Sequence, residues 1–335
     1  MTILVTGATG MVGANLVRLL LEQGEGPLRV LVRRGANRLA LEGLPVEIAE
    51  GDVEDEASTA AAVKGCAVVF HAAGLADVGG APVERLWAVN VRGTENVCRA
   101  ALAAGVEKLV HTSSAAAVDA APPGALADEE TRTGVLGRGA QPYARSKKEA
   151  EAVVLRYVAR GLPAVIVNPS LMFGAWDVKP TSGKTIVVAA RRWVPFYPVG
   201  GANVLDVRDA VAGHVAAWRH GAVGERYILG CRNLTYRELL RIIHAAVGRR
   251  PPVVPLWPAP ARLAARLARP FAAHLPPVAR ELTSPDAVDA VSRTHHVSAA
   301  KAIRVLALPQ TPVEEAVGRA HAWLRDHGYL NGEGR

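Results

Sequence analysis

The sequence has few cysteines and few aromatic residues, and it lacks long apolar runs. Its three cysteines, Cys66, Cys98 and Cys231, are odd in number and widely spaced, which argues against a disulfide framework and against a C-x-x-C site. We therefore expect buried thiols in a reducing cytoplasm. No apolar run reaches the roughly 18 residues of a membrane span. No basic and apolar leader precedes the first predicted strand, so a cytoplasmic location is expected.

Metal and nucleic-acid sites are also not indicated. The ten histidines show no ligand spacing, so no metal site is predicted. Aromatic residues make up 5% of the chain and the arginines are scattered, so the net charge of +8 does not indicate a nucleic-acid surface. Part of this excess suits a phosphate-bearing cofactor. With 50% hydrophobic and 21% charged residues, the chain is long enough for one large or two smaller globular domains.

A glycine-spaced turn stands at the start of the chain. Residues 3–13 read I-L-V-T-G-A-T-G-M-V-G, which is an apolar strand, a tight turn and the beginning of a helical pattern. In this context Gly7 allows the sharp turn, Gly10 lets the backbone approach a pyrophosphate, and Gly13 lets the helix pack on the strand. The helix N-terminus would add free N–H groups for the phosphates. An ordinary glycine-rich turn is the alternative, and the strand-turn-helix context favours dinucleotide binding.

Strands and helices alternate through the first half of the chain. Helices are predicted over 82–104 and 141–160, between short apolar strands at 2–6, 28–33, 45–50, 67–71, 107–112 and 163–168. This alternation predicts an α/β fold with a Rossmann-like, doubly wound parallel sheet. Ligands of such sheets bind at the carboxyl ends of the strands. The residues that follow each strand are therefore candidate site residues.

Two arginines follow the second predicted strand. A carboxylate in this place would bind the ribose 2′-hydroxyl of NAD, whereas Arg33 and Arg34 suit the 2′-phosphate of NADP. NADP(H) is therefore the preferred cofactor, with NAD(H) as the alternative. A pair of solvent-facing arginines would leave the preference open. Asp52 follows the third strand, where it is also a candidate N-cap for a helical run from Glu54.

The residues after the fourth strand are small. Ala72, Ala73 and Gly74 let the backbone run close to a cofactor, while His71 is interpreted as a packed residue at the strand end rather than an acid or base. T-S-S at 112–114 and N-P-S at 168–170 follow the fifth and sixth strands. These segments complete the predicted carboxyl edge of the sheet.

The motif with the most chemistry is Y-x-x-x-K at 143–147. Positions i and i+4 share one helix face, so Lys147 lies beside Tyr143. A phenol with a pKa near 10 is a poor acid or base at neutral pH, and an adjacent ammonium group lowers that pKa. Ser114 would donate a hydrogen bond to the substrate oxygen. The motif alone is common by chance as a surface pair, but here it follows the other motifs in order.

Taken together, these motifs resemble the extended short-chain dehydrogenases/reductases, within the NAD-dependent epimerase/dehydratase family. The nearest groups are dihydroflavonol-4-reductase-like proteins and bacterial hopanoid-associated sugar epimerases. The resemblance rests on motifs at 6–13, 71–74, 90–96, 112–114, 143–147, 168–170, 179–181, 205–209 and 224–230, and so covers almost the whole chain.

The resemblance implies a catalytic set of Ser114, Tyr143 and Lys147. It implies that Asp52 and Val53 lie by the adenine and that Asn90 lies near the nicotinamide. The further cofactor contacts that it implies are Gly7, Thr9, Gly10, Met11, Val12, Gly13, Ala72, Ala73, Gly74, Thr112, Tyr143, Lys147, Pro169 and Ser170. Members often dimerise through the two long helices, here 82–104 and 141–160, so a homodimer is expected.

The expected activity is hydride transfer between a nicotinamide and a secondary alcohol/ketone pair. One alternative is a sugar epimerase that keeps its NAD bound. A remote alternative is a non-catalytic dinucleotide-binding sensor, which the intact Tyr/Lys pair disfavours. Nucleotide-sugar epimerases usually read Y-G-P-R after the sixth strand, whereas residues 172–177 read M-F-G-A-W-D. A nucleotide-sugar substrate is therefore in doubt.

The second half of the chain is predicted to form a smaller, mostly helical C-terminal substrate domain. Residues 170–202 and 231–330 would build it, while 203–230 return to the cofactor domain of residues 1–169 with a short strand, a helix over 207–220 and a strand at 225–229. Candidate substrate contacts are Ser114, Met172, Phe173, Trp176 and Tyr197, because residues 171–202 are rich in aromatics. A small satellite core under a long loop is the alternative.

The basic residues of the second half are not assigned to substrate binding. Lys179, Lys184, Arg191 and Arg192 are assigned to solvated surface rather than to a substrate anion. A basic amphipathic helix is predicted over 261–274, with Leu263, Leu267 and Phe271 among its apolar residues. A lid or plain packing is favoured for it over peripheral membrane contact. The last helix, predicted over 313–327, closes the fold.

Overall fold

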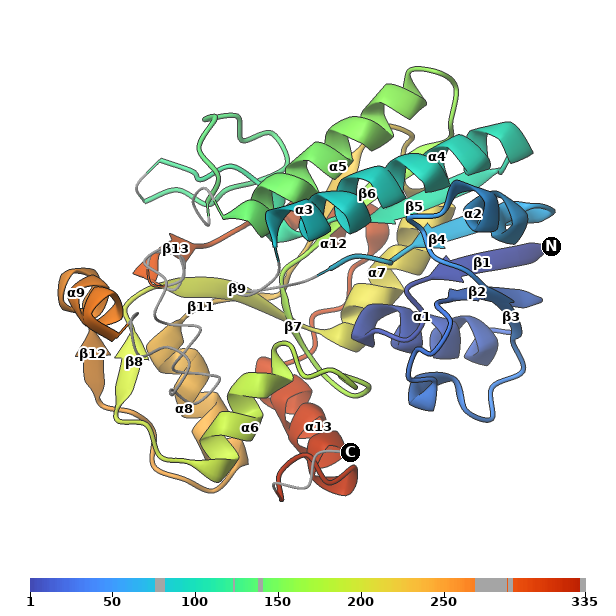
Figure 1. Ribbon diagram of the computed structural model, residues 1–335. Helices are drawn as coiled ribbons and strands as arrows, with labels where there is room; N and C mark the ends of the chain where they lie inside the picture. Colours follow the sequence, from blue (N-terminus) through green and yellow to red (C-terminus); the bar gives the residue numbers. More distant parts are fainter. Residues whose placement is uncertain (76–81, 123, 138–140, 269–287, 289–291, 332–335) are drawn as a thin grey trace.

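Seven parallel strands form the centre of the molecule, in the order β10-β6-β5-β4-β1-β2-β3 (Figure 1). Every neighbouring pair runs parallel. The strands are β1 (Thr2–Thr6), β2 (Leu28–Val32), β3 (Glu47–Glu50), β4 (Cys66–His71), β5 (Lys108–Thr112), β6 (Ala164–Pro169) and β10 (Arg226–Leu229). The structure is a computed structural model, and it describes residues 1–75, 82–122, 124–137, 141–268, 288 and 292–331.

Helices cover both faces of this sheet, because its strands are apolar on both sides. Successive side chains of a strand point to opposite faces. Ile3 and Val5 therefore pack with α1 (Met11–Glu22) and α7 (Val207–His220) on one face, whereas Leu4 packs on the other. The helices of that second face are α2 (Glu56–Val63), α4 (Gly93–Ala104) and α5 (Pro142–Val158). The predicted doubly wound α/β fold is confirmed.

The strand order reverses at β1. Strand β2 lies on one side of β1 and β4 on the other, and the connecting helices α1 and α4 cover opposite faces. In open parallel sheets a ligand crevice forms outside the carboxyl ends of the strands at such a reversal. The glycine turn after β1 and the segment after β4 meet there.

A second lobe carries a four-stranded sheet in which β9 pairs with three partners, β7, β11 and β13. These strands are β7 (Leu171–Phe173), β9 (Gly201–Asp206), β11 (Arg232–Thr235) and β13 (Thr294–His295). Three helices, α6 (Gly183–Arg191), α8 (Tyr236–Ala246) and α13 (Val313–Asp326), pack with them in a separate apolar core. Helix α12 (Ala300–Leu306) returns to the face of the large sheet that α1 and α7 cover.

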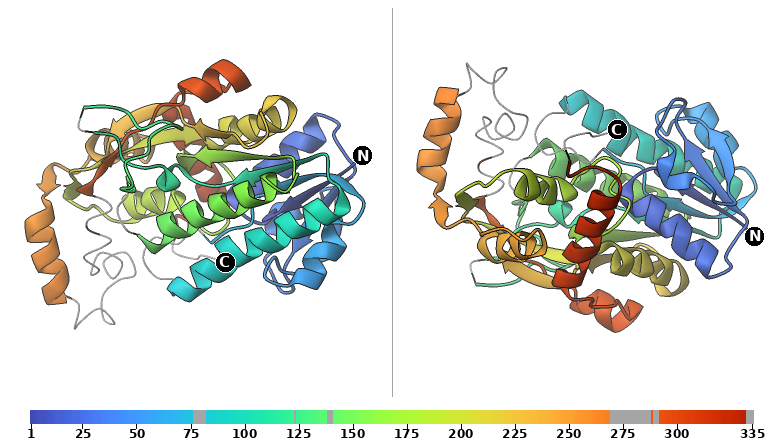
Figure 2. Two further views of the ribbon diagram at one scale, coloured as in Figure 1. Left: turned by 90° about the horizontal axis from the view of Figure 1, so that it is seen from above. Right: turned by 90° about the horizontal axis from the view of Figure 1, so that it is seen from below.

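The far end of the second lobe holds a two-stranded sheet of β8 (Phe196–Pro198) and β12 (Val254–Leu256). Helix α9 (Pro258–Ala268) follows β12 directly and lies at the edge of the molecule in all three views (Figures 1 and 2). Only part of the helix predicted over 261–274 is described, because residues 269–274 lie outside the described residues.

Most element boundaries agree with the sequence predictions, and the helix predicted over 207–220 has those bounds. The single helix predicted over 82–104 is instead three segments, α3 (Val83–Leu86), the π-helical η2 (Trp87–Arg92) and α4. The short strand predicted near 203 is β9, which belongs to the second sheet and not to the large one. The division of the chain into two domains at 170, 203 and 231 stays a prediction.

Candidate active site

The glycine turn after β1 has no room for side chains. Gly7 has a φ of +73°, and a Cβ added there would lie 2.5 Å from the Ala73 nitrogen. A Cβ at Gly13 would lie 2.4 Å from the Gly7 carbonyl oxygen. Glycine at both positions lets the turn, the start of α1 and residues 72–73 come together.

The N-terminus of α1 is not neutralised by any side chain of its own first turn. Gly10 is the N-cap, so no side chain caps the helix, and the first turn carries no acidic residue. The free backbone N–H groups and the positive end of the helix dipole therefore stay available to an anion. Thr9, Met11 and Val12 flank this point and are partly exposed.

His71 joins the ends of β1 and β4 through a chain of hydrogen bonds. Thr94 donates its hydroxyl to the Asn90 carbonyl oxygen, over 2.6 Å, so it accepts from Nε2 of His71, at 3.0 Å. Nδ1 of His71 then accepts from the Thr6 hydroxyl, at 2.8 Å, while Thr6 Oγ1 accepts from the Ala73 N–H. Burial, with the charge of Lys147, lowers the pKa of His71 to about 3. His71 is thus a neutral structural residue.

Asn90 holds the segment after β4 against α5. Its side-chain oxygen accepts from the Leu75 N–H, at 2.7 Å, and its side-chain nitrogen lies 3.1 Å from the Leu75 carbonyl oxygen. The same nitrogen donates to the Ser146 hydroxyl, at 2.9 Å. Ser146 in turn donates to the Tyr143 carbonyl oxygen. Asn90 therefore positions both Leu75 and the first turn of α5.

Lys147 is buried where β4, β5 and α5 meet. Its Nζ donates to the Thr112 carbonyl oxygen, at 2.9 Å. A Cβ added at Gly74 would lie 2.9 Å from the same Nζ, so a side chain there would shift the ammonium group from this position. Burial lowers the pKa of Lys147 to about 8, against the opposing charge of Glu151.

Ser114 and Tyr143 lie on adjacent segments beside this lysine. Ser114 caps the short helix η3 (Ala115–Ala117), because its hydroxyl oxygen accepts from the Ala116 N–H, at 3.1 Å. The half-buried Tyr143 packs in one cluster with Ala116 and Leu136. The tyrosine of α5 thus lies against the turn that begins with Ser114.

Glu151 lies one turn beyond Lys147 on α5 and organises a buried polar network. One carboxylate oxygen accepts from the Ser113 hydroxyl and from the Asn168 side chain, both at 2.5 Å. The other lies 3.2 Å from the Arg226 guanidinium. Asn168 also donates to the Ser114 carbonyl oxygen, at 3.0 Å. The network ties α5, β6 and β10 to the Ser113 side chain and to the Ser114 carbonyl group.

Two more histidines, one on β5 and one on α7, are buried near this network. Nδ1 of His214 donates to the Ala210 carbonyl oxygen, at 2.7 Å, so its Nε2 accepts from the Thr112 hydroxyl, at 3.0 Å. Burial lowers the pKa of His214 to about 4. The ring of His111 lies 5.3 Å from that of His71, and neither of its nitrogens has a hydrogen-bond partner among the described residues. Burial holds the pKa of His111 well below its usual range.

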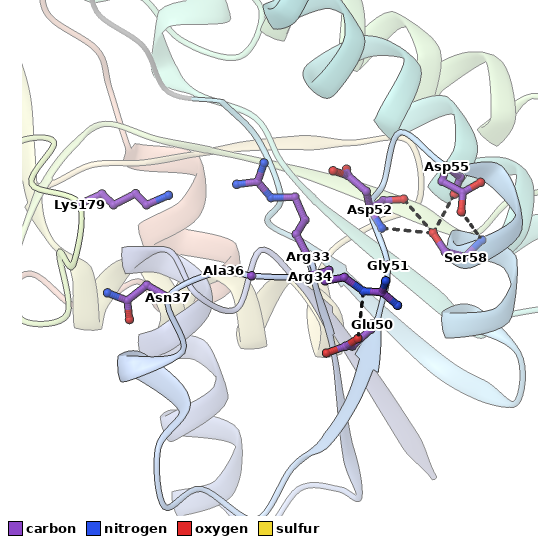
Figure 3. A pocket seen from close by; sticks show the side chains of 11 residues that line it. Arg33, Arg34, Ala36, Asn37, Glu50, Gly51, Asp52, Asp55, Ser58 and Lys179 are labelled. Atoms are coloured by element: carbon purple, nitrogen blue, oxygen red, sulfur yellow. Dashed lines mark hydrogen bonds and ion pairs between the residues drawn. The ribbon is translucent and has the colours of Figure 1, made fainter.

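A hollow of about 780 Å³ lies at the carboxyl ends of β2 and β3 (Figure 3). Its lining includes Arg33, Arg34, Asn37 and Asp52, and Lys179 points into it from the opposite wall. Arg34 lies 3.8 Å from Glu50, whereas Arg33 and Lys179 have no ion-pair partner in the described part of the chain. Lys179 is exposed, as expected from the sequence, and it also lines this hollow.

The segment that carries Lys179 is held on both sides. Buried Asp177 accepts from the Thr181 and Gly183 N–H groups, at 2.9 and 3.0 Å, and so closes the turn before α6. On the side of the large sheet, Asn15 of α1 donates to the Ala175 carbonyl oxygen, at 2.9 Å. The guanidinium of Arg18 lies 3.4 Å from the ring centre of Trp176. The loop is thus attached to the helix that begins at the glycine turn.

These features are those of one enzyme family. The sequence profile of the NAD dependent epimerase/dehydratase family matches residues 3–230. The chain belongs to the NAD-dependent epimerase/dehydratase family. This family is part of the extended short-chain dehydrogenases/reductases, so the predicted resemblance is confirmed.

Individual relatives agree with this assignment over the whole length. The chain is 38% identical to the putative dihydroflavonol 4-reductase of Synechocystis sp., over 97% of this chain and 95% of the relative. It is 33% identical to sterol demethylase protein B of Methylococcus capsulatus, over 98% of this chain and 100% of the relative. The crystal structure of gox2253 matches with a TM-score of 0.86 and 37% identity, covering 98% of this chain and 99% of the other.

An NAD(P) dinucleotide is the typical cofactor of the epimerase/dehydratase family, and the residues present fit one. Glycine at positions 7 and 13 lets the turn pack on residues 72–73 and on the start of α1, and the exposed Gly10 leaves the N-terminus of that helix uncovered. The hollow beside Arg33 and Asp52 lies where the adenosine end would be held. Among the described residues, no group of three or more His, Cys, Asp or Glu side chains forms a metal site.

Not every candidate cofactor residue presents its side chain to the crevice. Val53 is buried in the core, where its Cγ2 would lie 2.8 Å from a Cβ at Gly93. The Ser170 hydroxyl donates to the Asn203 side chain, at 2.9 Å, and Pro169 is buried at the end of β6. These residues would meet a cofactor only through their backbone or at their edges.

The cap of α2 differs from the sequence prediction. Asp55, and not Asp52, is the N-cap, and its carboxylate accepts from the Ala57 and Ser58 N–H groups. The helix begins at Glu56 rather than at Glu54, because Asp52 instead closes a turn by accepting from the Glu54 N–H, at 3.1 Å. The Asp52 carboxylate therefore stays beside the hollow.

The candidate substrate residues of the second lobe are not equivalent. Phe173 is 1% exposed in the second core, and Trp176 packs against Arg18, Trp323 and His327. For these two rings the satellite-core alternative is favoured. Met172 and Tyr197 are partly exposed and stay candidates.

Proposed function

We propose that this protein is an NADP(H)-preferring carbonyl reductase of the dihydroflavonol-reductase-like type, which interconverts a ketone and a secondary alcohol. Membership of an oxidoreductase/epimerase family supports the general chemistry. The observation that carries the proposal is the buried Lys147 ammonium, held against Thr112 and next to Gly74, with Tyr143 and Ser114 on the adjoining segments. This set lies at the carboxyl edge of the sheet, where ligands of such folds bind.

In this proposal Ser114, Tyr143 and Lys147 have separate roles at the reacting carbonyl group. When bound, the cofactor supplies or accepts the hydride. The Ser114 hydroxyl donates to the carbonyl oxygen and orients it. Tyr143 protonates that oxygen in the reducing direction and takes the proton back in the oxidising direction. Lys147 stabilises the phenolate form of Tyr143 and so lowers its pKa toward the working pH.

Three groups of residues would hold the dinucleotide. The N-terminus of α1, with Gly7 to Gly13, would bind the pyrophosphate. Lys147 and residues 72–74 would bind the nicotinamide end. Asp52 would bind the adenine, and Arg33 and Arg34 would bind the 2′-phosphate of NADP.

The preference for NADP(H) is supported by the charge around the hollow. Arg33 projects into it from the end of β2 and Lys179 reaches toward it from the second lobe (Figure 3). A guanidinium and an ammonium group without ion-pair partners among the described residues suit a phosphate dianion better than a ribose hydroxyl. NAD(H) remains the alternative cofactor.

One experiment separates the reductase from the sugar epimerase. The purified protein is mixed with NADPH or NADH and a panel of ketones and aldehydes, and loss of cofactor absorbance is followed. A reductase consumes added NADPH in proportion to the ketone, and its protein preparation needs added cofactor. Purification with bound NAD, together with activity on a sugar without cofactor consumption, would instead identify an epimerase. Cofactor binding without turnover of any substrate would favour the sensor.

We also propose that the protein forms a homodimer through α4 and α5, the long helices on one face of the sheet. These helices pack against each other and bury one side on the sheet. Leu155 stays 44% exposed on the outer side of α5. Light scattering after size-exclusion chromatography would give the mass of two chains, and Leu155→Arg would shift it toward one chain.

A further inference from the structure

Exposed apolar side chains gather at the far end of the second lobe. Of the seventeen large apolar side chains that are exposed in the described residues, eight lie in only two stretches. They are Trp193, Val194, Phe196, Val253, Val254, Trp257, Leu263 and Leu267. Single exposed apolar residues are normal on a protein surface, but a continuous group of this kind marks an interaction site.

The two stretches form one surface, which we call the apolar corner (residues 193–196 and 253–267). Strand β8 pairs with β12 in a register that sets Val254 opposite Phe196. The Val253 and Val254 N–H groups both donate to the Pro195 carbonyl oxygen, at 3.0 and 2.9 Å. Helix α9 starts directly after β12, and Figures 1 and 2 show it at the outer edge, away from the large sheet.

Helix α9 buries small side chains and exposes large apolar ones, which is the reverse of the usual arrangement of a surface helix in water. Two of its alanines face inward, Ala261 and Ala265, which are 5% and 4% exposed and pack with Leu256. Its leucines face outward, with Leu263 and Leu267 at 60% and 66% exposure. A surface helix of a water-soluble domain buries its larger apolar residues, so this arrangement indicates that another apolar medium covers the leucines.

The charged residues within the apolar corner and next to it in sequence all have one sign. Residues 188–198 and 249–268 contain no Asp or Glu. They contain six arginines, all exposed: Arg191, Arg192, Arg249, Arg250, Arg262 and Arg266. Two of these, Arg262 and Arg266, lie on α9 among its exposed leucines. The apolar corner and the residues next to it in sequence thus combine exposed apolar side chains with cations and no anion.

We propose that the apolar corner docks the protein on the surface of an anionic lipid bilayer. Outward leucines would enter the boundary between headgroups and acyl chains, and the arginines would bind lipid phosphates. Trp193 and Trp257 are the residue type that prefers this boundary. The attachment is peripheral, since none of the described helices is long and apolar enough to cross a bilayer. The sequence favours a lid or plain packing for this helix. Neither role explains why its leucines are exposed.

The test is co-sedimentation of the full chain with vesicles, without cofactor or substrate. Vesicles of phosphatidylcholine alone are compared with vesicles of equal parts phosphatidylcholine and phosphatidylglycerol. We expect binding to the anionic vesicles, and a loss of about tenfold or more in Leu263→Gln/Leu267→Gln and in Arg262→Gln/Arg266→Gln. The control is Leu126→Gln, which changes a leucine that is 51% exposed outside the apolar corner and should bind like the parent.

Several results would overturn the proposal. Absence of binding to anionic vesicles would do so, as would equal binding of the leucine variant and the parent. If the leucine variant changed only the oligomeric mass, the corner would be an interface between copies of the chain. Circular dichroism of each variant checks folding, and because these side chains are exposed we expect parental spectra. Vesicle binding is measured apart from turnover, so its failure leaves the reductase proposal untouched.

Discussion

The Nζ of Lys147 donates a hydrogen bond to the carbonyl oxygen of Thr112, over 2.9 Å, across the junction of α5 and β5. Both residues are nearly inaccessible to water. The ammonium group is therefore fixed at the carboxyl edge of the sheet by a main-chain acceptor, independently of any bound ligand. This arrangement favours function at some cost in stability, because a charged group loses its hydration there.

Replacing Lys147 by Met should abolish turnover and yet stabilise the fold. At pH 7 the folded parent holds a poorly hydrated charge, and its removal should raise the Tm by roughly 2–4 °C. The folded pKa of Lys147, about 8, lies below that of an unfolded lysine. The parent therefore gains stability as pH rises above 8, and the difference in Tm should narrow. Lys64→Met, at an exposed site, is the control, and a lower Tm for Lys147→Met would contradict the argument.

Replacing Tyr143 by Phe should lower kcat by about 10²–10⁴-fold. The ring keeps its packing against Ala116 and Leu136, so the fold and the cofactor Kd should change little. Stopped-flow turnover and fluorescence titration with NADPH measure the two quantities. Parental turnover in this variant would exclude Tyr143 as the proton donor.

Replacing Glu151 by Gln should change the pH dependence of the reaction, because Glu151 acts through Lys147 and not by contact with the substrate. The change removes the carboxylate that supports the charge of Lys147, so the pKa of Lys147 should fall further. An alkaline limb of the kcat/KM profile that reports Lys147 should then move to lower pH. Glu149→Gln, on the exposed side of the same helix, is the matched control and should keep the parental profile. A uniform loss of activity at all pH values would indicate a purely structural role.

Cofactor choice should depend on cations from both walls of the hollow. Arg33→Asp and Lys179→Met should each raise the KM for NADPH, by about 10–100-fold for a lost charged hydrogen bond, and leave the KM for NADH nearly unchanged. Arg160→Asp changes an exposed arginine elsewhere and serves as the control. An unaltered ratio of kcat/KM for NADPH and NADH would reject the assignment of the hollow to the 2′-phosphate.

Acid should destabilise the fold through its buried histidines. Folded His71 and His214 have pKa values of about 3 and 4, whereas an unfolded histidine titrates near 6.5. The unfolded chain therefore binds more protons below pH 6.5, and stability should fall by about 1.4 kcal/mol per pH unit for each such histidine. His111 is a third buried histidine whose pKa is lowered by burial. Replacing it by Leu removes this titrating group and two buried nitrogens that have no hydrogen-bond partner among the described residues. Urea unfolding should show higher stability and a shallower pH slope; an unchanged slope would count against this.

The parts of the fold that sequence predicts are those encoded by local pattern. Short apolar runs predict the strands of the large sheet, and the spacing of Gly7, Gly10 and Gly13 predicts the turn, because each glycine meets a steric need within a few residues. The spacing of Tyr143 and Lys147 likewise places both on one helix face. Such local requirements can be predicted from the sequence without knowledge of the tertiary structure.

The parts that sequence did not predict depend on long-range contacts. Lys179 lines the hollow only because Asn15 and Arg18 hold its loop against α1. Glu151 is one turn after Lys147, and that spacing was the available signal, but its partners come from β5, β6 and β10. The outward leucines of α9 carry no local signal, since an amphipathic pattern does not say which face is buried.

Arg18 stacks on Trp176 while Asn15 donates to the carbonyl group of the preceding residue, so the loop that leads to Lys179 is fixed to α1 without any ligand. The backbone that carries this cation therefore needs no rearrangement to meet an anion in the hollow. Preorganisation of this kind lowers the cost of binding, because less conformational freedom is lost when the ligand arrives.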